Sequence, residues 1–371
     1  MAEIEIGMGK TGRRAYGLDD IALVPTRRTR DPEDIDLTWE IDAFRFELPI
    51  MAAAMDSVVS PARAVELGEL GAVGVLPIEG LWTRYDDPQP FLDEVAGLDG
   101  DRATARLQEL YAEPIKPELI RDRIREIRSG GVTSCASITP QRLPELADAL
   151  LAAELDLLVV QGSVVSAEHV TRDGDPLNLK TFVRRFDIPV IVGGCASYQA
   201  ALHLMRTGAA GILVGVGSGA TSTTRRVLGL GSAQATAIAD ARAARMRHLD
   251  ETGVYVHLIA DGGIGTGGDI AKAVACGADA AMIGAPLAAT EGAPGRGYHW
   301  GLSGGHREVP RAEIIATPPV GTLREVLVGP AHRSDGRTNL AGALRRSMAS
   351  CGYPTLKELQ KAELTITPVH P

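Results

Sequence analysis

The stretch 208–226, which reads GAAGILVGVGSGATSTTRR, carries the pattern on which the fold prediction rests. An apolar run at 212–216 leads into glycines at 215, 217 and 219, and four hydroxylated residues follow at 221–224. This pattern is typical of a buried strand that opens into a tight loop. Glycine accepts positive φ and lets a ligand approach the backbone, so the N–H groups and hydroxyls of such a loop can converge on an anion. The alternative is a strand-to-helix turn that binds nothing.

Apolar runs of strand length recur along the chain, and helix-sized segments separate most of them. Short, continuously apolar strands that alternate with helices favour an all-parallel sheet covered on its outside. Eight such units predict an α/β fold closed as a (β/α)₈ TIM barrel. The expected strands are 48–54, 71–76, 132–136, 156–160, 189–192, 211–214, 256–260 and 280–283. The expected helices are 61–70, 117–129, 141–153, 177–186, 197–207, 233–250 and 268–276.

We predict a single domain over residues 1–371, with two additions to the barrel. Residues 17–25 form a polar start and an apolar run stopped by proline, which indicates an extended N-terminal arm. Residues 77–118 contain several prolines and many acids, which indicates an excursion with short helices near the active-site loops.

Composition excludes several classes of function. The 371-residue chain has a net charge of −9 and is 45% hydrophobic, so no nucleic-acid partner is expected. The longest uncharged run, 207–224, is too rich in glycine and hydroxyls for a membrane span. Residues 1–10 do not resemble a signal peptide, and we expect a cytoplasmic protein. The four cysteines (135, 195, 276 and 351) have no metal-ligand or disulfide spacing, so we expect free thiols and no metal.

The loops at the carboxyl ends of the last strands predict a phosphate site. Functional loops of a barrel follow the C-terminal ends of its strands, and phosphate is usually held near the last two. Asp261-Gly262-Gly263 follows the seventh expected strand, and Gly284-Ala285 follows the eighth. Their N–H groups, with those of the loop after the sixth strand, can converge on one phosphate. Asp261 suits ribose hydroxyls, and its alternative role is a helix N-cap.

The chain resembles the IMP dehydrogenase/GMP reductase family over nearly its whole length. The segment between residues 76 and 132 is too short for the CBS domains that many members insert there, so the resemblance is to the short, IMP dehydrogenase-related branch. The motifs are LDDIALVP (18–25), PIMAAAMDSV (49–58), VGVGSGATSTTR (214–225), ADGGIGTGGDIAKAVACGADAAMIGAPLAATEGAPG (260–295) and LAGALRRSMASCGYPTLKELQ (340–360).

The resemblance implies a purine nucleoside monophosphate as substrate. It assigns the purine base to Met55 and the ribose to Asp261. In the family a serine often stands at two of the phosphate positions, here Ala220 and Ala285, so backbone N–H groups would have to replace some hydroxyl contacts. The phosphate residues implied by position are Gly217, Ala220, Gly263, Gly284, Ala285 and Tyr298.

The catalytic loop departs from the family at its nucleophile. The family has a cysteine whose thiolate attacks C2 of the purine before hydride leaves to NAD, and Ser222 stands at that position. A thiol has an unperturbed pKa near 8.5 and gives a strong nucleophile, whereas a serine hydroxyl needs a base beside it. Thr224 and Arg225 match residues that the family uses near the water or ammonia step.

The positions that the resemblance assigns to the cofactor also differ. NAD is implied, or NADP in a GMP reductase. Gln161 stands where an aspartate usually contacts the nicotinamide riboside, with Ser163 following, and Gly194 stands where an asparagine is usual. Cys135 and Cys195 fall near the ends of expected strands, where packing as small apolar residues is the favoured interpretation. The chain ends at Pro371, so the resemblance gives little support for a monovalent-cation site.

Four hypotheses about function follow. The first is an IMP dehydrogenase-related oxidoreductase that binds IMP or a close purine monophosphate, with altered chemistry because of Ser222. The second is a GMP reductase, with Asp335 as its acidic residue. The third is a non-catalytic purine-nucleotide-binding protein, and the fourth is a flavin-dependent barrel. The resemblance also implies a homo-oligomer, usually a tetramer.

Overall fold

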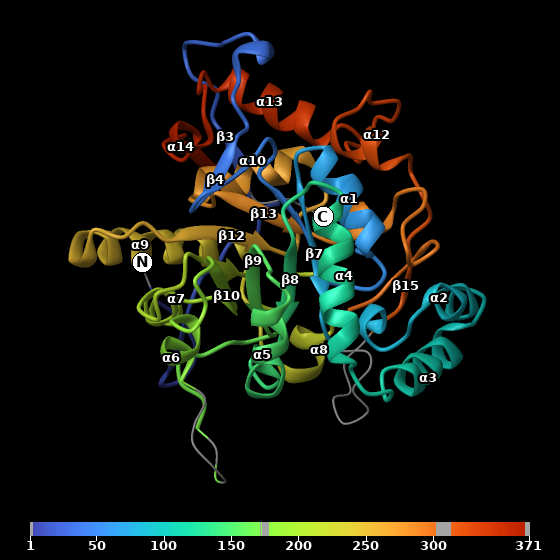
Figure 1. Ribbon diagram of the computed structural model, residues 1–371. Helices are drawn as coiled ribbons and strands as arrows, with labels where there is room; N and C mark the ends of the chain where they lie inside the picture. Colours follow the sequence, from blue (N-terminus) through green and yellow to red (C-terminus); the bar gives the residue numbers. More distant parts are fainter. Residues whose placement is uncertain (1–2, 171, 173–177, 302–312, 368–371) are drawn as a thin grey trace.

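Eight parallel strands close into a barrel in the computed structural model, which describes residues 3–170, 172, 178–301 and 313–367 (Figure 1). The strands follow one another around the barrel in chain order, and the last pairs with the first. The prediction of a (β/α)₈ TIM barrel is confirmed. The barrel strands are β6 (Ile50–Ala52), β7 (Val73–Pro77), β8 (Cys135–Ile138), β9 (Leu157–Gln161), β10 (Val190–Cys195), β11 (Gly211–Val214), β12 (His257–Asp261) and β13 (Ala280–Ile283).

The strands are buried on both faces, as their continuous apolar sequences predict. One strand is displaced from its expected position. β8 begins at Cys135 and not at Val132, because Ser134 turns to Asp156 and donates hydrogen bonds from its backbone N–H at 2.8 Å and from its hydroxyl at 2.7 Å. The side chain of Val132 packs against Gly68 on the outside of the barrel.

Helices cover the barrel between successive strands. Ser60 caps α1 through its hydroxyl, and Thr266 and Asp269 form a capping box at the start of α10. Each expected helix is present; the helix expected at 117–129 has the predicted bounds and the others have shifted ends, and the expected start of one of them, residue 177, lies outside the described residues. The covering helices are α1 (Pro61–Glu69), α4 (Pro117–Ser129), α5 (Leu143–Ala152), α6 (Leu179–Val183), α7 (Tyr198–Met205), α9 (Gln234–Thr252) and α10 (Gly267–Cys276).

Segments from both ends of the chain pack on the N-terminal side of the barrel and along α10. Trp39 in β4 (Trp39–Ile41) stacks on Phe46 in β5 (Phe44–Phe46), and its indole N–H donates to Nδ1 of His257 at 3.3 Å. The N-terminal arm is extended as predicted, and its strand β3 pairs with β16. The other elements of this region are β3 (Ile21–Leu23), η1 (Pro32–Asp34), α13 (Leu340–Ser350), α14 (Leu356–Leu359) and β16 (Leu364–Ile366).

The excursion after β7 folds into short helices, as expected, and forms an apolar cluster of its own. Leu81, Leu92 and Leu107 pack there around the buried indole of Trp300, which comes from the far end of the sequence. Further elements lie among the loops between β7 and the C-terminal region. They are η2 (Leu81–Thr83), α2 (Gln89–Ala96), α3 (Gly100–Leu110), α8 (Thr224–Leu228), α11 (Ala285–Ala288), β14 (Tyr298–His299), β15 (Ile315–Ala316) and α12 (Leu323–Leu327).

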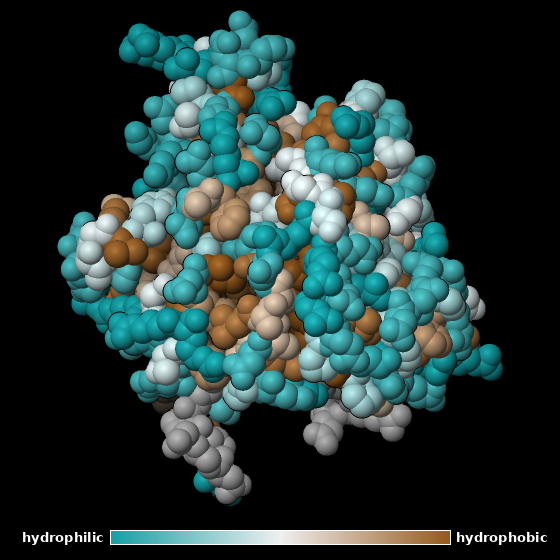
Figure 2. All heavy atoms as spheres, viewed as in Figure 1, coloured by the Kyte–Doolittle hydropathy of each residue, from teal (hydrophilic) through white to brown (hydrophobic). Residues whose placement is uncertain are grey.

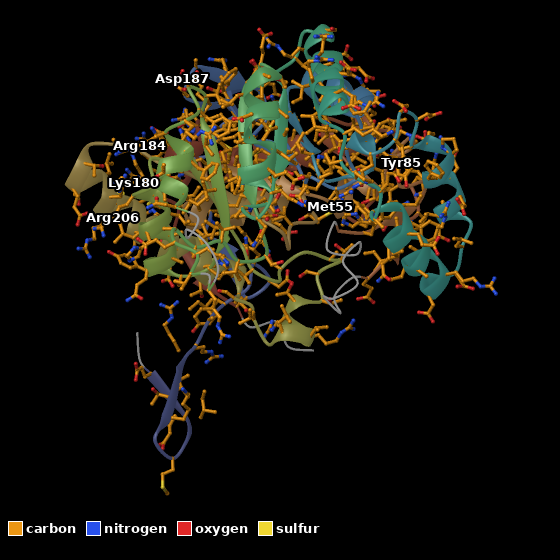
Figure 3. The ribbon with its side chains drawn as sticks, turned by 60° about the horizontal axis from the view of Figure 1, so that its bottom comes forward. Met55, Tyr85, Lys180, Arg184, Asp187 and Arg206 are labelled. Atoms are coloured by element: carbon orange, nitrogen blue, oxygen red, sulfur yellow. The ribbon has the colours of Figure 1, made fainter. Side chains whose placement is uncertain are left out.

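The surface is mostly hydrophilic on the face shown in Figure 2, with apolar side chains gathered near its middle. A hairpin of β1 (Glu3–Gly7) and β2 (Lys10–Arg13) stands away from the barrel (Figure 3). Among the described residues, no helix has both the length and the apolar character needed to cross a membrane.

Candidate functional site

The loop after β11 packs directly against the turn after β12. Gly215 has no room for a side chain, because a Cβ there would overlap the carbonyl oxygen of Asp261. Ser218 Oγ donates a hydrogen bond to the same carbonyl oxygen at 2.8 Å. A Cβ on Gly262 would lie 2.7 Å from Ser218 Oγ and 2.8 Å from the amide nitrogen of Gly219. Two of the three glycine corners expected from the sequence are therefore in contact.

The conformation of these corners requires glycine. Gly217, Gly262 and Gly263 have φ angles of 70°, 82° and 74°, in the left-handed region that side chains disfavour. Gly263 and Ala220 are both exposed at the barrel rim. The backbone of both corners is therefore accessible to a ligand on the C-terminal side of the barrel.

The third corner, at Gly284, lies next to these two because β13 pairs with β12. A Cβ on Gly284 would lie 3.2 Å from the ring of His299 and 3.5 Å from Cβ of Ala53. Nδ1 of His299 lies 3.0 Å from Ser57 Oγ, and burial lowers the pKa of His299 to about 4, so the ring is neutral. The sequence analysis did not predict His299, because no motif marks this residue and only its neighbour Tyr298 was a candidate.

Tyr298 and Met55 lie on loops that border the same region. Tyr298 is half-buried and packs against the apolar cluster that contains Trp300. Met55 follows β6 and is half-buried against the main core, near the middle of the molecule in Figure 3. Its carbonyl oxygen accepts hydrogen bonds at 2.9 Å from the amides of Val58 and Val59, which fix the turn. The predicted contacts of both side chains with a nucleotide stay predictions.

Asp261, the residue expected to bind ribose, meets Gln161 across the barrel mouth. Nε2 of Gln161 donates to Oδ2 of Asp261 at 3.2 Å. Burial raises the pKa of the Asp261 carboxyl to about 6, and the hydrogen bond from Gln161 opposes that rise. Near neutral pH the carboxyl is therefore mostly ionised, as an acceptor for hydroxyl groups must be.

Ser222 lies in the loop before α8, among other hydroxyl groups. Its Oγ donates to Oγ1 of Thr224 at 3.2 Å, and its backbone N–H donates to the carbonyl oxygen of Gly219 at 3.0 Å. The stem of Arg225 packs against Gly231. Among the described residues, the Ser222 hydroxyl contacts the hydroxyl and the backbone N–H of Thr224, and neither can act as a general base for it.

The four cysteines do not replace the missing nucleophile, because all of them are buried. Burial raises the pKa of Cys195 and of Cys276 to about 12 and also raises the pKa of Cys135. The prediction that Cys135 lies near the C-terminal end of a strand is wrong, since it begins β8. Cys195 ends β10 and points its thiol at the carbonyl oxygen of Leu213 at 3.5 Å. Packing as small apolar residues is confirmed for both.

The residues at the expected cofactor positions lie on neighbouring strand ends. Gly162 and Gly194 pair through their backbones, with the Gly194 N–H donating to the Gly162 carbonyl oxygen at 2.9 Å, and Ser163 follows in the same loop. A Cβ on Gly194 would overlap the carbonyl oxygen of Gly215. This close approach accounts for glycine at a position where the family usually has asparagine.

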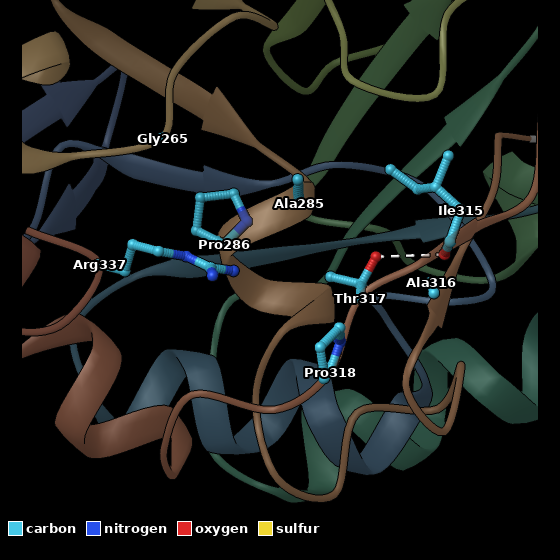
Figure 4. A pocket seen from close by; sticks show the side chains of 8 residues that line it. All are labelled: Gly265, Ala285, Pro286, Ile315, Ala316, Thr317, Pro318 and Arg337. Carbon is cyan, nitrogen blue, oxygen red and sulfur yellow. Dashed lines mark hydrogen bonds between the residues drawn. The ribbon is translucent and has the colours of Figure 1, made fainter. Parts of the chain in front are cut away.

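A pocket of about 260 Å³ lies beside Ala285, at the start of α11 (Figure 4). The guanidinium of Arg337 reaches it from the C-terminal segment, and the sequence prediction missed this residue because it considered only Asp335 in the same SDGR motif. Asp335 instead pairs with Arg333 at 2.8 Å. The pocket is lined by Gly265, Ala285, Pro286, Ile315, Ala316, Thr317, Pro318 and Arg337.

A buried carboxyl next to Met55 ties the excursion to the site, which the sequence prediction also missed. Asp56 accepts hydrogen bonds from the amide of Leu81 at 2.9 Å and from the hydroxyl of Tyr111. The indole N–H of Trp300 donates to the Tyr111 hydroxyl at 3.4 Å. Burial raises the pKa of Asp56 to about 6. An aspartate directly after Met55 was the signal available in the sequence.

Metal ligands do not gather in the described part of the chain, where no three His, Cys, Asp or Glu side chains are placed to hold an ion. Our expectations about metals and monovalent cations stay predictions.

Comparison with known proteins agrees with this geometry. Residues 15–303 match the model of the IMP dehydrogenase / GMP reductase domain. An uncharacterized oxidoreductase of Mycobacterium tuberculosis is 50% identical, over 98% of this chain and 99% of that protein. The inosine-5′-monophosphate dehydrogenase of Methanocaldococcus jannaschii is 27% identical, over 94% of this chain and 92% of its own length.

A solved structure is similar over the same extent. The crystal structure of an IMP dehydrogenase/GMP reductase-like protein from Corynebacterium glutamicum has a TM-score of 0.93 and 44% sequence identity, and covers 98% of each chain. The family model covers most of the sequence, and the barrel fold agrees with that of the similar solved structure. The chain therefore belongs to the IMP dehydrogenase/GMP reductase family.

Proposed function

We infer that the chain binds a purine nucleoside monophosphate, IMP or a close relative, at the C-terminal mouth of its barrel. The observation that carries this proposal is the contact between the loop after β11 and the Asp261–Gly263 turn, with Gly284 on the next strand. Backbone N–H groups at such corners suit a phosphate, and the Asp261 carboxylate suits ribose hydroxyls. The resemblance to the family supports the same placement.

The oxidation of IMP to XMP is impaired in this proposal. That reaction needs a nucleophile at C2, and in the described part of the chain the one side-chain partner of Ser222 is the hydroxyl of Thr224. The buried cysteines have raised pKa values, so none supplies a thiolate. The residues at the cofactor positions also fit NAD poorly, because Gln161 brings an amide in place of a carboxylate and Gly194 brings no side chain. We therefore derive no hydride step.

GMP reductase is a weaker candidate. It requires the same thiol, and the carboxylate expected to assist, Asp335, is held by Arg333 at 2.8 Å. Non-catalytic binding of the nucleotide is the stronger second candidate, because it needs the phosphate and ribose contacts but no nucleophile.

Binding is tested by calorimetric titration of the purified protein with IMP, GMP and XMP, with and without NAD. We expect saturable binding of a monophosphate that NAD leaves unchanged. Absence of heat with all three nucleotides would overturn the proposed binding. Strong coupling between IMP and NAD would instead support a working dehydrogenase.

Chemistry is tested by following NADH after mixing the protein with IMP and NAD. We expect no turnover by the natural chain. A gain in turnover by the Ser222→Cys variant would support the assignment of Ser222 to the nucleophile position. Ser129→Cys is the matched control, since it adds an exposed thiol on α4. Turnover by the natural chain at ordinary enzyme rates would contradict the claim that chemistry is impaired.

A homo-oligomer, with four copies as the expected number, is part of the proposal. The β1–β2 hairpin supports it, because Ile6 is 74% exposed there and an isolated two-stranded hairpin is only marginally stable in water. Sedimentation of the full chain tests this expectation, and a monomer at micromolar concentration would contradict it.

A further inference from the structure

Gln161 reaches across the mouth of the barrel to Asp261. Gln161 ends β9 and Asp261 ends β12, and the strands β10 and β11 lie between them in the barrel. The Gln161 amide donates to Oδ2 of Asp261 at 3.2 Å and contacts the sulfur of Met282 at 3.7 Å. Met282 is fully buried in β13 and pairs in register with Asp261. The carboxamide is thus directed toward the β12–β13 side, where ribose is expected.

The hydrogen-bonding capacity of this pair exceeds what the described residues of the protein use. A carboxylate accepts up to about four hydrogen bonds, and the amide of Gln161 supplies one. The carboxamide oxygen of Gln161 is a further acceptor. The two side chains therefore bring acceptor oxygens together at one point. The cis-2′,3′-diol of a ribose carries two adjacent hydroxyl donors of matching polarity.

The alternative place for Gln161 is the dinucleotide subsite, where the family usually has an aspartate. A carboxylate at that position can only accept hydrogen bonds, whereas the Gln161 amide donates one to another carboxylate. An aspartate at 161 would put a second negative charge beside Asp261 and raise the pKa of one of the two. Glutamine at position 161 thus donates a hydrogen bond to Asp261 without adding a second negative charge, which suits the mononucleotide site.

We propose that Gln161 is a specificity residue of the mononucleotide site: its carboxamide and the Asp261 carboxylate together hold the 2′,3′-diol of a ribonucleotide, and the mouth thereby disfavours 2′-deoxyribonucleotides. This inference rests on the proposed function. The amide orients the carboxylate, and its own oxygen accepts from one of the two hydroxyls.

The experiment is a calorimetric titration of the full chain and two variants with IMP and with 2′-deoxy-IMP. We expect the natural chain to bind IMP at least about tenfold more tightly than 2′-deoxy-IMP, because the 2′-hydroxyl adds one hydrogen bond to a charged pair. Gln161→Met removes donor and acceptor with little change of shape. It weakens IMP binding by about tenfold and brings the ratio of the two affinities close to one.

Gln161→Glu is the second variant. Its readout is the pH dependence of IMP binding, which would not change if Gln161 only packed against its neighbours. It keeps an acceptor, loses the donor and puts two carboxyls together, so IMP binding weakens at neutral pH and recovers as the pH is lowered and the pair shares a proton. Gln89→Met is the matched control, because Gln89 donates to Asp93 at 2.9 Å on exposed α2. It leaves both affinities unchanged, and thermal melting checks that each variant is folded.

The outcomes separate this inference from the proposed function. If Gln161→Met keeps both the IMP affinity and the preference for ribose, Gln161 is no part of the ribose site, and the proposed function still stands. If the natural chain binds neither nucleotide, the proposed function fails and this inference fails with it.

Discussion

Two aspartates at opposite ends of the barrel, Asp279 buried and Asp261 half-buried, have very different surroundings. Asp279 lies just before β13 on the N-terminal side, and four donors contact its carboxylate at 2.6–3.0 Å. Asp261 lies at the end of β12 on the C-terminal side, and in the described part of the chain Gln161 is the one side chain that donates to its carboxylate. The donors to Asp279 are Arg245, Tyr255, the amide of Leu258 and Gln360.

The difference indicates that Asp279 contributes to stability and that Asp261 is suited to binding a ligand. A carboxylate whose acceptor sites are filled by the protein holds elements together, here α9, β12, β13 and α14. A carboxylate with unfilled acceptor sites is unfavourable in the free protein and gains from a ligand that donates. Barrels follow this division generally, with residues for stability on the N-terminal face and residues for function on the C-terminal face.

The largest expected effect is a loss of stability on the N-terminal side. Arg245→Met leaves the Asp279 carboxylate without its charged partner, in a pair whose side chains are 2% and 7% exposed. We expect the free energy of unfolding to fall by about 3 kcal/mol in urea denaturation. Arg247→Met, which breaks the exposed Arg247–Glu251 pair, is the control and leaves the free energy of unfolding nearly unchanged, because solvent screens that pair. Equal losses in both variants would erase the proposed difference between the two ends.

Asp261→Asn is expected to weaken ligand binding and to leave stability nearly unchanged. It removes the charged acceptor for ribose hydroxyls, and we expect IMP to bind about 30-fold more weakly, or about 2 kcal/mol, in calorimetry. Stability in urea stays within about 1 kcal/mol, because an amide avoids the cost of burying a charge. The matched variant Asp279→Asn loses stability instead. An Asp261→Asn variant that binds IMP normally would contradict the assignment.

The pH dependence of binding sharpens the contrast. The pKa of Asp261 is raised to about 6 in the free protein, and hydroxyl donors bind its charged form. Affinity for IMP therefore falls as the pH drops through about 6, by at most about tenfold per pH unit for one proton, and levels off above about pH 7. The second pKa of a phosphate is also near 6, so Asp261→Asn serves as the control that retains only the phosphate contribution. Identical pH profiles for the two proteins would count against the role of Asp261.

The smallest expected effect concerns the contact between the two glycine corners. Ser218→Ala removes the hydrogen bond from Oγ to the carbonyl oxygen of Asp261, which measures 2.8 Å. We expect a loss of about 1 kcal/mol in unfolding free energy and a smaller loss in IMP affinity. Ser129→Ala on the exposed surface of α4 is the control. A gain in stability for Ser218→Ala would indicate that the two corners are not coupled.

The barrel could be predicted from sequence because its determinants are local. Each strand is a short apolar run, and some of the helices between them carry their own caps, such as Ser60 and Thr266. The displacement of β8 could not be predicted, because it depends on Ser134 bonding to Asp156, just before the neighbouring strand β9. Likewise, the position of the hairpin containing Trp39 could not be predicted, because its contact with His257 joins residues far apart in the sequence.

The candidate site was predictable as a set of strand ends but not as a set of contacts. Gly217, Gly263 and Gly284 were expected from their motifs, since positive φ and close approach leave a sequence signal. The contact between Gln161 and Asp261 joins residues far apart in the sequence, and no periodicity reports it. Arg337 was missed for the same reason, because only the fold brings it to Ala285.

The central claim is that the glycine corners and Asp261 hold one nucleoside monophosphate, and a crystal structure of the protein soaked with IMP tests it most directly. The account predicts the phosphate on the backbone N–H groups near Ala220, Gly263 and Gly284, with the ribose hydroxyls on Asp261. IMP bound elsewhere on the chain, or a mouth that stays without nucleotide at saturating IMP, would contradict it.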